Sequence, residues 1–510
     1  MLAPDSLARQ LDPAAELERL RRIASELGGR ERVERQHARG FLTARERLDL
    51  LLDPGSEIEF GRLVHSGIPG EEERTLGDGR LVGFGAIDGR PVAYGASDAT
   101  IKGASGGAGA SRRGAAFERI VAASALPVFG LYQGGGARIT DVLSSKFTGF
   151  FGAGLGRRLA FPRRGAHFVA VLGNYYAPWN VADADVAIMT RASNASISSP
   201  PVVEEATGKK TTPFELGGPE VHARLTGQID AVVDDDAAAC AYLRRAFGYL
   251  PANPWEDAPV ARTGDPPDRV EPRLRSLVPD DPAWGFDVTR VIELVVDAGS
   301  FLEWKPEFGR NLVCGLARLD GHSIAVIANQ PRHLAGSMDV AASIKIRRML
   351  DACVAFRLPL VSFIDVPGVL PTPDQEHQRL LAHIYGLAVD RLRAHVPKIS
   401  VFLRKAYGYA LWGMSGADPE WYSFAWPSAQ IAFMGPEPGV RVAWRRQWEA
   451  APDPDAFLAR HAAELREAAR PWAAAERAYI DDVIDPAATR PILARALRIA
   501  RARLAATRPS

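Results

Sequence analysis

Apolar residues recur at helical spacing near the N-terminus of the chain and in shorter, strand-like runs further on. Residues 13–29, PAAELERLRRIASELGG, have apolar side chains at helical intervals and end in two glycines. Residues 43–56, TARERLDLLLDPGS, predict a shorter helix that stops at Asp53-Pro54-Gly55. Beyond these helices, strand-like runs alternate with helix-like runs, which predicts α/β domains with largely parallel sheets.

One succession of elements occurs twice along the chain. Each copy contains a hairpin that turns at an Asp-Gly pair, then a helix, then a buried strand. In the first copy these elements are residues 80–98, 111–125 and 126–132, and in the second they are residues 314–330, 341–356 and 358–365. Gly315 follows Gly83 by 232 residues, and Leu358 follows Leu126 by the same number. The constant displacement predicts two domains of the same fold.

A proline-rich, charged segment separates the two copies. It has the sequence TGDPPDRVEPRLRSLVPDDPAWGFD and spans residues 263–287. Such a composition is typical of a connection between domains. We therefore predict an N-terminal domain over 1–265, a linker over 266–283 and a C-terminal domain over 284–510.

Three consecutive glycines follow the strand of the first copy. The stretch LPVFGLYQGGGARITD contains Gly134, Gly135 and Gly136, followed by Ala137 and Arg138. Ligands of open α/β sheets collect at the carboxyl ends of strands, where this stretch lies. A phosphate, a developing oxyanion or a tightly packed turn would each explain why side chains are missing there. The second copy has a glycine-bearing stretch, IDVPGVLP, in the equivalent place.

Composition and charge exclude several classes of protein. The chain has 510 residues, 47% of them hydrophobic, and a formal net charge of +1, so no global field favours nucleic acid or an anionic membrane. No apolar run reaches the roughly 18 residues that a membrane span needs. The three cysteines lie far apart in apolar segments, which favours buried thiols in the cytoplasm. The histidines form no metal-ligand pattern and no catalytic dyad stands out, so we expect no metal and predict chemistry by backbone amides and a cofactor.

Several longer motifs resemble the carboxyltransferase β subunit of biotin-dependent acyl-CoA carboxylases, of the propionyl-CoA and methylcrotonyl-CoA type. The resemblance runs from about residue 40 to residue 480. Its strongest pieces are SFLEWKPEFGRNLV, ANQPRHLAGSMD, IDVPGVLPTPDQEH, VPKISVFLRKAYG and AWPSAQIAFMGPE. The family implies an α/β fold of two tandem crotonase-like (ClpP/crotonase) domains, in agreement with the internal repeat.

The resemblance also implies a site. The loop at Gly135 and Gly136 is similar to an oxyanion hole that holds the thioester of an acyl-CoA as an enolate, with Gly134, Ala137 and Arg138 beside it. In the second domain, Gly408, Tyr409 and Ala410 match a loop whose amides bind the ureido oxygen of biotin, and Trp412 matches a residue that tunes acyl-chain choice. The family implies an enzyme, a ligase or transferase, that moves a carboxyl group from carboxybiotin to the α-carbon or a vinylogous position.

The family further implies partners. Biotin would be carried on a separate protein, coenzyme A would arrive as part of the substrate, and biotin carboxylase and biotin carrier subunits would join a homo-oligomer, a hexamer. Neither nucleic acid nor a membrane is an expected partner.

Three departures from the family pattern fall near the expected reaction centre. Tyr409 stands where the family has a second glycine, and a positive φ would be costly there. Residues 173–180, GNYYAPWN, replace a stretch like GPCAGGAVYSP, and residues 375–386, QEHQRLLAHIYG, lack the usual glycine and arginine after QEH. These departures leave two alternatives open: a biotin-independent acyl-CoA enzyme on the same scaffold, such as a decarboxylase or another enolate-forming enzyme, or a non-catalytic paralogue.

Overall fold

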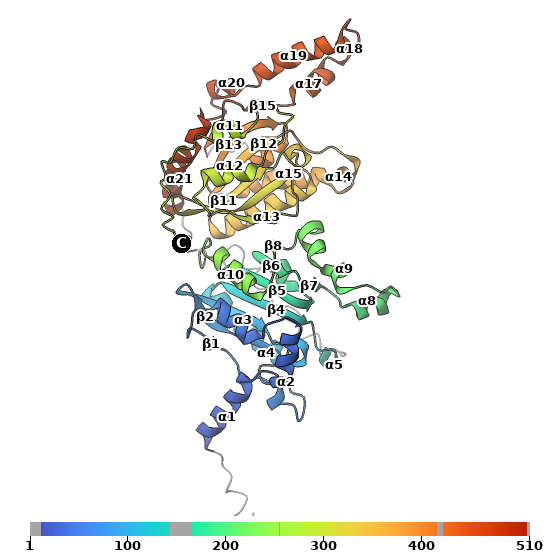
Figure 1. The fold of residues 1–510 in the computed structure, drawn as a ribbon, viewed down its shortest axis with the longest axis vertical. Helices are drawn as coiled ribbons and strands as arrows, with labels where there is room; N and C mark the ends of the chain where they lie inside the picture. The colour runs from blue at the N-terminus through green and yellow to red at the C-terminus, as the bar shows by residue number, and fades with distance from the viewer. Residues whose placement is uncertain (1–11, 143–164, 254, 416–421, 507–510) are drawn as a thin grey trace, which may run out of the picture. The chain divides into compact units, whose positions relative to one another are not determined.

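The computed structural model describes residues 12–142, 165–253, 255–415 and 422–506. The chain divides into two compact units, Met1–Phe247 with Ala252–Pro254 and Gly248–Pro251 with Trp255–Ser510. Each unit contains one sheet with helices packed on it (Figure 1).

The first unit contains a sheet with the strand order β1-β2-β3-β4-β5-β6-β8, and β7 pairs with β5. The pairs β1–β2 and β2–β3 are antiparallel and the others are parallel. The strands are β1 (Ile58–Glu59), β2 (Arg80–Ile87), β3 (Arg90–Ser97), β4 (Val128–Gly135), β5 (His167–Tyr176), β6 (Val186–Thr190), β7 (Asn194–Ser196) and β8 (Ala231–Val233). The helices are α1 (Pro13–Ser25), α2 (Arg30–Ala38), α3 (Ala44–Leu51), α4 (Ala108–Ser124), α5 (Ile139–Val142), α7 (Trp179–Asp183), α8 (Pro200–Thr207), α9 (Pro213–Gly217) and α10 (Asp236–Phe247), with the short turns η2 (Glu73–Thr75), η3 (Lys102–Ala104) and η5 (Glu220–Leu225).

The second unit repeats this arrangement, with the order β16-β14-β13-β12-β11-β10-β9 and β15 paired with β13. Its strands are β9 (Leu302–Trp304), β10 (Leu312–Leu319), β11 (His322–Asn329), β12 (Leu360–Val366), β13 (Lys398–Tyr407), β14 (Ser423–Ala425), β15 (Gln430–Ala432) and β16 (Asp482–Val483). Its helices are α11 (Leu274–Leu277), α12 (Val288–Val295), α13 (Val340–Phe356), α14 (Pro373–His377), α15 (Leu380–Arg393), α16 (Ala410–Met414), α17 (Pro436–Ala443), α18 (Arg445–Glu449), α19 (Pro454–Ala468), α20 (Pro471–Glu476) and α21 (Thr489–Ala506), with the short turns η6 (Leu334–Gly336) and η7 (Pro486–Ala488).

The structure confirms the predicted fold class. Both hairpins, the helices α4 and α13 and the turns η3 and η6 begin and end 232 residues apart. The aspartates of the two hairpin turns also share a left-handed conformation, with φ of 52° at Asp88 and 54° at Asp320. The chain is therefore an α/β protein of two tandem crotonase-like domains related by an internal repeat.

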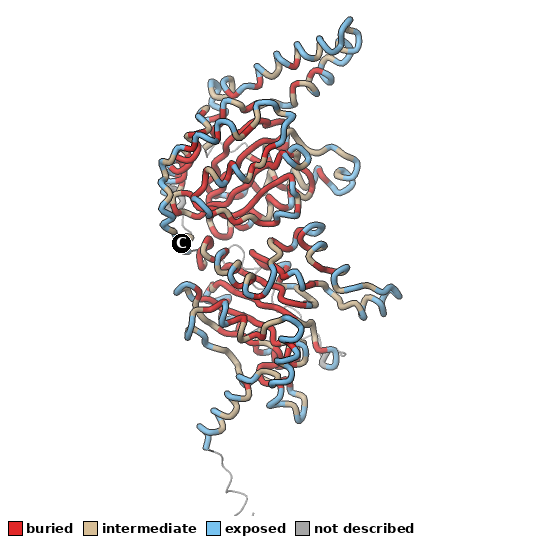
Figure 2. The backbone as a smooth tube through the Cα atoms, in the orientation of Figure 1, coloured by how far each residue is buried: buried red, intermediate tan, exposed pale blue. Residues whose placement is uncertain are grey.

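Different kinds of contact stabilise the cores of the two units. In the first, Phe129 of β4 stacks on Phe168 of β5 at 4.5 Å between ring centroids, and Phe247 of α10 meets Phe129 edge-on at 5.3 Å. In the second, Trp426 beside β14 is buried and donates a hydrogen bond to Thr489 of α21 over 3.0 Å. The strands β3–β6 and β10–β13 of the two sheets are largely buried, whereas α1 and α19 are largely exposed (Figure 2).

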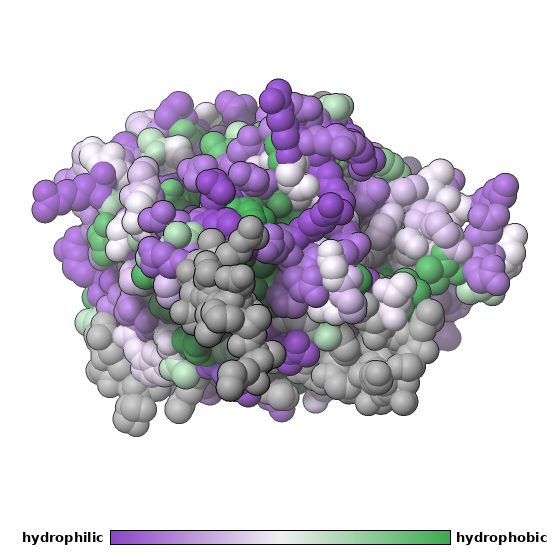
Figure 3. Space-filling view, turned by 90° about the horizontal axis from the view of Figure 1, so that it is seen from below, coloured by the Kyte–Doolittle hydropathy of each residue, from purple (hydrophilic) through white to green (hydrophobic). Residues whose placement is uncertain are grey.

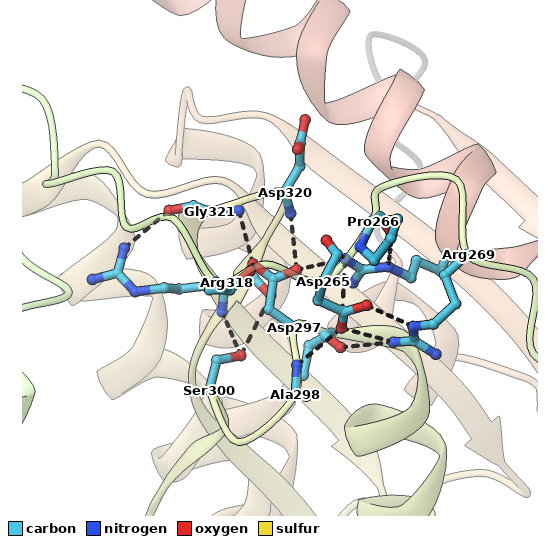
Figure 4. A network of polar contacts seen from close by, with 12 residues as sticks. Asp265, Pro266, Arg269, Asp297, Ala298, Ser300, Arg318, Asp320 and Gly321 are labelled. Carbon is cyan, nitrogen blue, oxygen red and sulfur yellow. Dashed lines mark hydrogen bonds and ion pairs between the residues drawn. The ribbon is translucent and has the colours of Figure 1, made fainter.

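The segment predicted as a linker is bound firmly to the second unit. The buried Arg490 donates to the carbonyls of Asp265 and Pro266 at 3.0 and 2.9 Å. Figure 4 labels these two acceptor residues within the surrounding polar network. The buried Arg404 donates to the carbonyls of Pro279, Asp281 and Trp284 at 2.9–3.1 Å. Residues 266–283 thus pack on the second unit, and the boundaries at 265 and 284 stay a prediction.

The surface of the described residues is mixed. The face shown in Figure 3 is mainly hydrophilic, with small apolar patches scattered over it. Among the residues that the structure describes, no helix has both the length and the hydropathy that crossing a membrane would require.

Candidate functional site

The triple-glycine loop lies at the carboxyl end of β4, beside the loop that leads into α4. The amide of Gly106 donates to the carbonyl of Gly136, and the amide of Arg138 donates to the carbonyl of Gly106, each over 2.8 Å. These two hydrogen bonds hold residues 136–138 parallel to residues 105–107. Both loops lie at the strand ends where ligands of such sheets bind.

Glycine occupies positions 134, 135 and 136 for different structural reasons. A Cβ on Gly134 would lie 2.3 Å from the carbonyl oxygen of Gly103, and one on Gly135 would lie 3.0 Å from the ring of Tyr176. Gly134 and Gly135 are thus explained by close packing within the protein. Gly136 is different, because its φ is 65° and a Cβ there would meet no atom closer than 3.9 Å. Only Gly136 faces open space.

A backbone amide without a protein acceptor lies next to Gly136 in this loop. Among the described residues, the amide of Ala137 donates to no protein group. A partly exposed amide next to a glycine with open space can reach a ligand oxygen. Gly136 and Ala137 together therefore form the part of the loop that is free to bind a carbonyl.

Arg138 stabilises the glycine loop through buried polar contacts. Its guanidinium is buried and donates to Asp78 over 2.5 Å and to the carbonyl of Ser105 over 3.0 Å. The other oxygen of the Asp78 carboxylate accepts from the amide of Ala110 in α4 at 2.9 Å. Arg138 thus links the glycine loop to the start of α4, and its predicted contact with substrate stays a prediction.

A basic pocket adjoins this loop. It is a cavity of about 240 Å³ lined by Arg32, Arg35, Gln36, Arg39, Ala99, Thr100, Lys102 and Gly103. Gly103 belongs both to this pocket and to the packing of Gly134. Part of the positive charge is compensated, because Lys102 pairs with Glu71 and Arg35 pairs with Glu31. Clustered guanidinium groups favour phosphate oxygens.

Sequence reasoning missed this pocket. Its signal is present in RERVERQHAR, where Arg32, Arg35 and Arg39 recur at helical intervals and line one side of α2 and its end. The spacing alone is typical of a solvated helix face, and only the fold brings Lys102 and Thr100 to it.

The second candidate loop follows β13. Gly408 has φ of 63°, and its amide donates to the carbonyl of Ala432 in β15 over 3.1 Å. Among the described residues, the amides of Tyr409 and Ala410 donate to no protein group. Ala410 is only 1% exposed, and a buried amide without an acceptor is uncommon in a folded protein. These two adjacent amides are suited to one ligand carbonyl.

The predicted backbone cost at Tyr409 is wrong. Its φ and ψ are −65° and −22°, which any residue adopts, and the left-handed residue of this turn is Gly408. Tyr409 therefore replaces a glycine without straining the chain. Its ring meets that of Trp412 edge-on at 5.2 Å, and the two residues are 60% and 51% exposed, so neither belongs to the core.

Burial alters the pKa of ionisable side chains near this loop, raising that of Tyr407 and lowering that of Lys405. Burial lowers the pKa of Lys405, and the neighbouring Asp365 carboxylate opposes that change. The Lys405 ammonium lies 3.5 Å from the carbonyl of Ala335 and 3.7 Å from Asp365. Ala335 has φ of 53°, so Lys405 stabilises an unusual turn in η6.

Comparison with known proteins agrees with this architecture. The family model of the carboxyl transferase domain matches residues 35–509. The propionyl-CoA carboxylase carboxyltransferase subunit of Haloferax mediterranei is 38% identical over 96% of each chain. The α subunit of methylmalonyl-CoA decarboxylase from Veillonella parvula is 36% identical over 92% of each chain.

A solved structure shares the fold. Transcarboxylase 12S, whose structure shows a hexamer assembly with methylmalonyl-coenzyme A and methylmalonic acid bound, superimposes with a TM-score of 0.89. The two chains are 35% identical, and the match covers 98% of this chain and 95% of that one. The chain belongs to the carboxyl transferase domain family.

Proposed function

We propose that the chain is the carboxyltransferase subunit of an acyl-CoA carboxylase of the propionyl-CoA or methylmalonyl-CoA type. The observation that carries the proposal is that the amides of Tyr409 and Ala410 have no protein acceptor among the described residues, combined with the open space beside Gly136 and Ala137. The similar proteins are named for that activity, and they match this chain over nearly its whole length.

The first unit would bind the acyl-CoA. Gly136 and Ala137, next to the tightly packed Gly135, would hold the thioester carbonyl, whose oxygen becomes negative when a carbanion forms on the α-carbon. Amide donors aimed at such an oxygen lower the barrier by stabilising the charge as it develops. The basic pocket beside Gly103 is suited to the phosphate groups of coenzyme A, since Arg32, Arg35 and Arg39 supply positive charge there.

The second unit would bind biotin on its carrier protein. Tyr409 and Ala410 fit a ureido carbonyl, because both amides lack a protein acceptor and the neighbouring rings leave them beside exposed apolar surface. Biotin, when bound, supplies or accepts the carboxyl group. Gly408 holds the turn, and Trp412 would border the position of the acyl chain.

We also propose the partners that this role requires. They are a biotin carboxylase, a biotin carrier protein and further copies of this chain, in a hexamer like that of transcarboxylase 12S. A cytoplasmic location is supported by the three cysteines, Cys240, Cys314 and Cys353, which are buried and free.

A second candidate is a decarboxylase that needs no biotin. The family-divergent residue Tyr409 leaves this alternative open, and one similar protein is named as a methylmalonyl-CoA decarboxylase subunit. The test supplies the purified chain with methylmalonyl-CoA, with or without free biotin, and follows propionyl-CoA by chromatography. If the chain transfers the carboxyl group to biotin, the rate of propionyl-CoA formation should rise when free biotin is added. Equal rates without biotin would favour the decarboxylase, and no product in either case would contradict both functions.

The Gly136→Val variant tests the acyl-CoA side. A valine at φ of 65° is strained and intrudes on the open space, so we expect the rate of propionyl-CoA formation to fall roughly 10²-fold or more. The matched control is Gly208→Val, since Gly208 has φ of 69° and open space but lies outside the candidate site, at the end of α8. An equal loss in both variants, or none in Gly136→Val with the fold intact, would remove the site from this loop.

A further inference from the structure

The internal repeat places residues 176–181 of the first unit in the position of residues 407–412 of the second. β5 ends at Tyr176 and β13 ends at Tyr407, and each is followed by a left-handed residue, Ala177 with φ of 53° and Gly408 with φ of 63°. The amide of Ala177 donates to the carbonyl of Ser196 in β7 over 3.0 Å, as that of Gly408 does to Ala432 in β15.

A further hydrogen bond fixes the correspondence residue by residue. The amide of Val181 donates to the carbonyl of Pro178 over 3.0 Å, and the amide of Trp412 donates to that of Tyr409 over 3.0 Å. Pro178 therefore corresponds to Tyr409, and Trp179 corresponds to Ala410.

The two loops differ in the donors that they offer. In the second unit, the amides of both corresponding residues, Tyr409 and Ala410, lack a protein acceptor among the described residues. In the first unit, Pro178 has no N–H, and the amide of Trp179 donates to the carbonyl of Ala177 over 2.9 Å. With φ and ψ of −83° and 51°, Pro178 is the central residue of an inverse γ-turn, which engages that amide.

The loop at residues 177–179 adjoins the loop at residues 136–137 of the same unit, which we propose binds the thioester. Gly135 pairs with Tyr176 across β4 and β5, and a Cβ on Gly136 would lie 3.9 Å from the carbonyl oxygen of Tyr176. Donors at positions 178 and 179 would therefore face the same region as the amide of Ala137.

We propose that Pro178 closes the first unit's copy of the carbonyl-binding loop, so that the acyl thioester is held by the Gly136–Ala137 loop without help from residues 178 and 179. The inference rests on the proposed function. It makes the two units chemically unequal: the second keeps its amide pair, while the first has lost one donor to proline and the other to an internal hydrogen bond.

The Pro178→Ala variant tests the inference by restoring an N–H and releasing the γ-turn. The assay is decarboxylation of methylmalonyl-CoA: the bond between the α-carbon and the carboxylate breaks, CO₂ leaves, the electron pair moves onto the thioester oxygen, and water returns a proton to the α-carbon. We expect the rate to rise about tenfold, because a single oxyanion donor is worth at least that much elsewhere. An unchanged or lower rate with an unchanged melting temperature would overturn the inference.

The reverse variant probes the open copy. Tyr409→Pro should abolish the response to free biotin, whereas Tyr409→Ala, which keeps the N–H, should retain most of it. The backbone tolerates the change, because Ala177-Pro178 already combines a left-handed residue with a following proline. Equal loss in both variants would show that the ring, and not the amide, matters, and would overturn the assignment of this loop.

A binding measurement separates this inference from the proposed function. S-propyl-CoA lacks the thioester carbonyl of propionyl-CoA, so the ratio of the two dissociation constants, from calorimetry, reports donors to that carbonyl. Pro178→Ala should shift the ratio several-fold toward propionyl-CoA, and a constant ratio would overturn the inference. An absent response to biotin in the unaltered chain would contradict only the proposed function.

Discussion

The hairpin turns of the two units are stabilised by the same set of contacts in different surroundings. In the first unit, Asp53 accepts from the amides of Asp88 and Gly89 at 3.0 and 2.8 Å and from Arg244 of α10 at 3.2 Å. In the second, Asp297 accepts from the amides of Asp320 and Gly321 at the same two distances and from Arg490 of α21 at 2.7 Å. In each unit, one aspartate thereby links the hairpin turn to a helix that follows much later in the chain, α10 in the first unit and α21 in the second.

The two ion pairs differ in burial. The side chains of Asp53 and Arg244 are each 28% exposed, whereas those of Asp297 and Arg490 are fully buried. The segment before α11 covers the second pair, and Thr263 adds a hydrogen bond to Asp297 over 3.0 Å. Water screens the first pair, so the same contacts should have very different effects when one partner is removed.

The largest expected effect is that of Asp297→Ala. It leaves the buried guanidinium of Arg490 without a carboxylate at Asp297 and two turn amides without an acceptor. The free energy of unfolding of the second unit should fall by about 3–5 kcal/mol. Hydrogen exchange of the whole chain, followed by mass spectrometry of peptides, measures each unit separately. The double variant Asp297→Ala with Arg490→Met should recover part of the loss, and a larger loss in the double variant would contradict this account.

Asp53→Ala should be much milder. Because the pair with Arg244 is partly exposed, we expect a loss of about 1 kcal/mol or less in the first unit, by the same exchange measurement. A loss as large as that of Asp297→Ala would show that burial does not separate the two pairs.

The smallest effect is the pH dependence of the first pair. Hydrogen bonds from the amides of Gly89 and Asp88, together with Arg244, lower the pKa of Asp53 against the opposing effect of burial. A carboxylate with a lowered pKa stabilises the fold above its unfolded pKa of about 3.9, and that contribution disappears as the pH falls through the folded value. Between about pH 5 and pH 3 the unaltered first unit should therefore lose slightly more stability than Asp53→Asn, as measured by urea unfolding. Parallel curves would contradict the role of Asp53.

The repeat and the family motifs could be predicted from the sequence because they depend on local patterns. Periodicity and the constant displacement between Gly83 and Gly315 predict elements and their order without any knowledge of packing. The role of each glycine could not be predicted in this way. Gly134 is explained by the carbonyl of Gly103, which lies some thirty residues earlier in the chain, and only the folded sheet brings the two together.

The candidate site shows the same limit. That Tyr409 belongs to the candidate loop followed from its motif, but the left-handed residue of the turn is Gly408, in line with the general preference of glycine for positive φ. The closure of residues 177–179 depends on a hydrogen bond between Trp179 and Ala177, which the letters GNYYAPWN do not reveal. Composition predicted that residues 266–283 connect the domains, which stays a prediction, and it gave no sign of their contacts with Arg404 and Arg490.

This binding bears on where the polypeptide could be divided into two genes. Arg318 donates to the carbonyls of Gly248 and Pro259 at 2.6 and 2.7 Å, and its guanidinium lies 4.8 Å from the ring centre of Tyr249. In a C-terminal fragment that began at residue 284, Arg318, Arg404 and Arg490 would lose their carbonyl acceptors at residues 248, 259, 265, 266, 279 and 281, and we expect this fragment to aggregate. A fragment that began at residue 248 would keep the segment whose carbonyls accept from these arginines. The chain is therefore better divided before residue 248 than within the proline-rich segment 263–287.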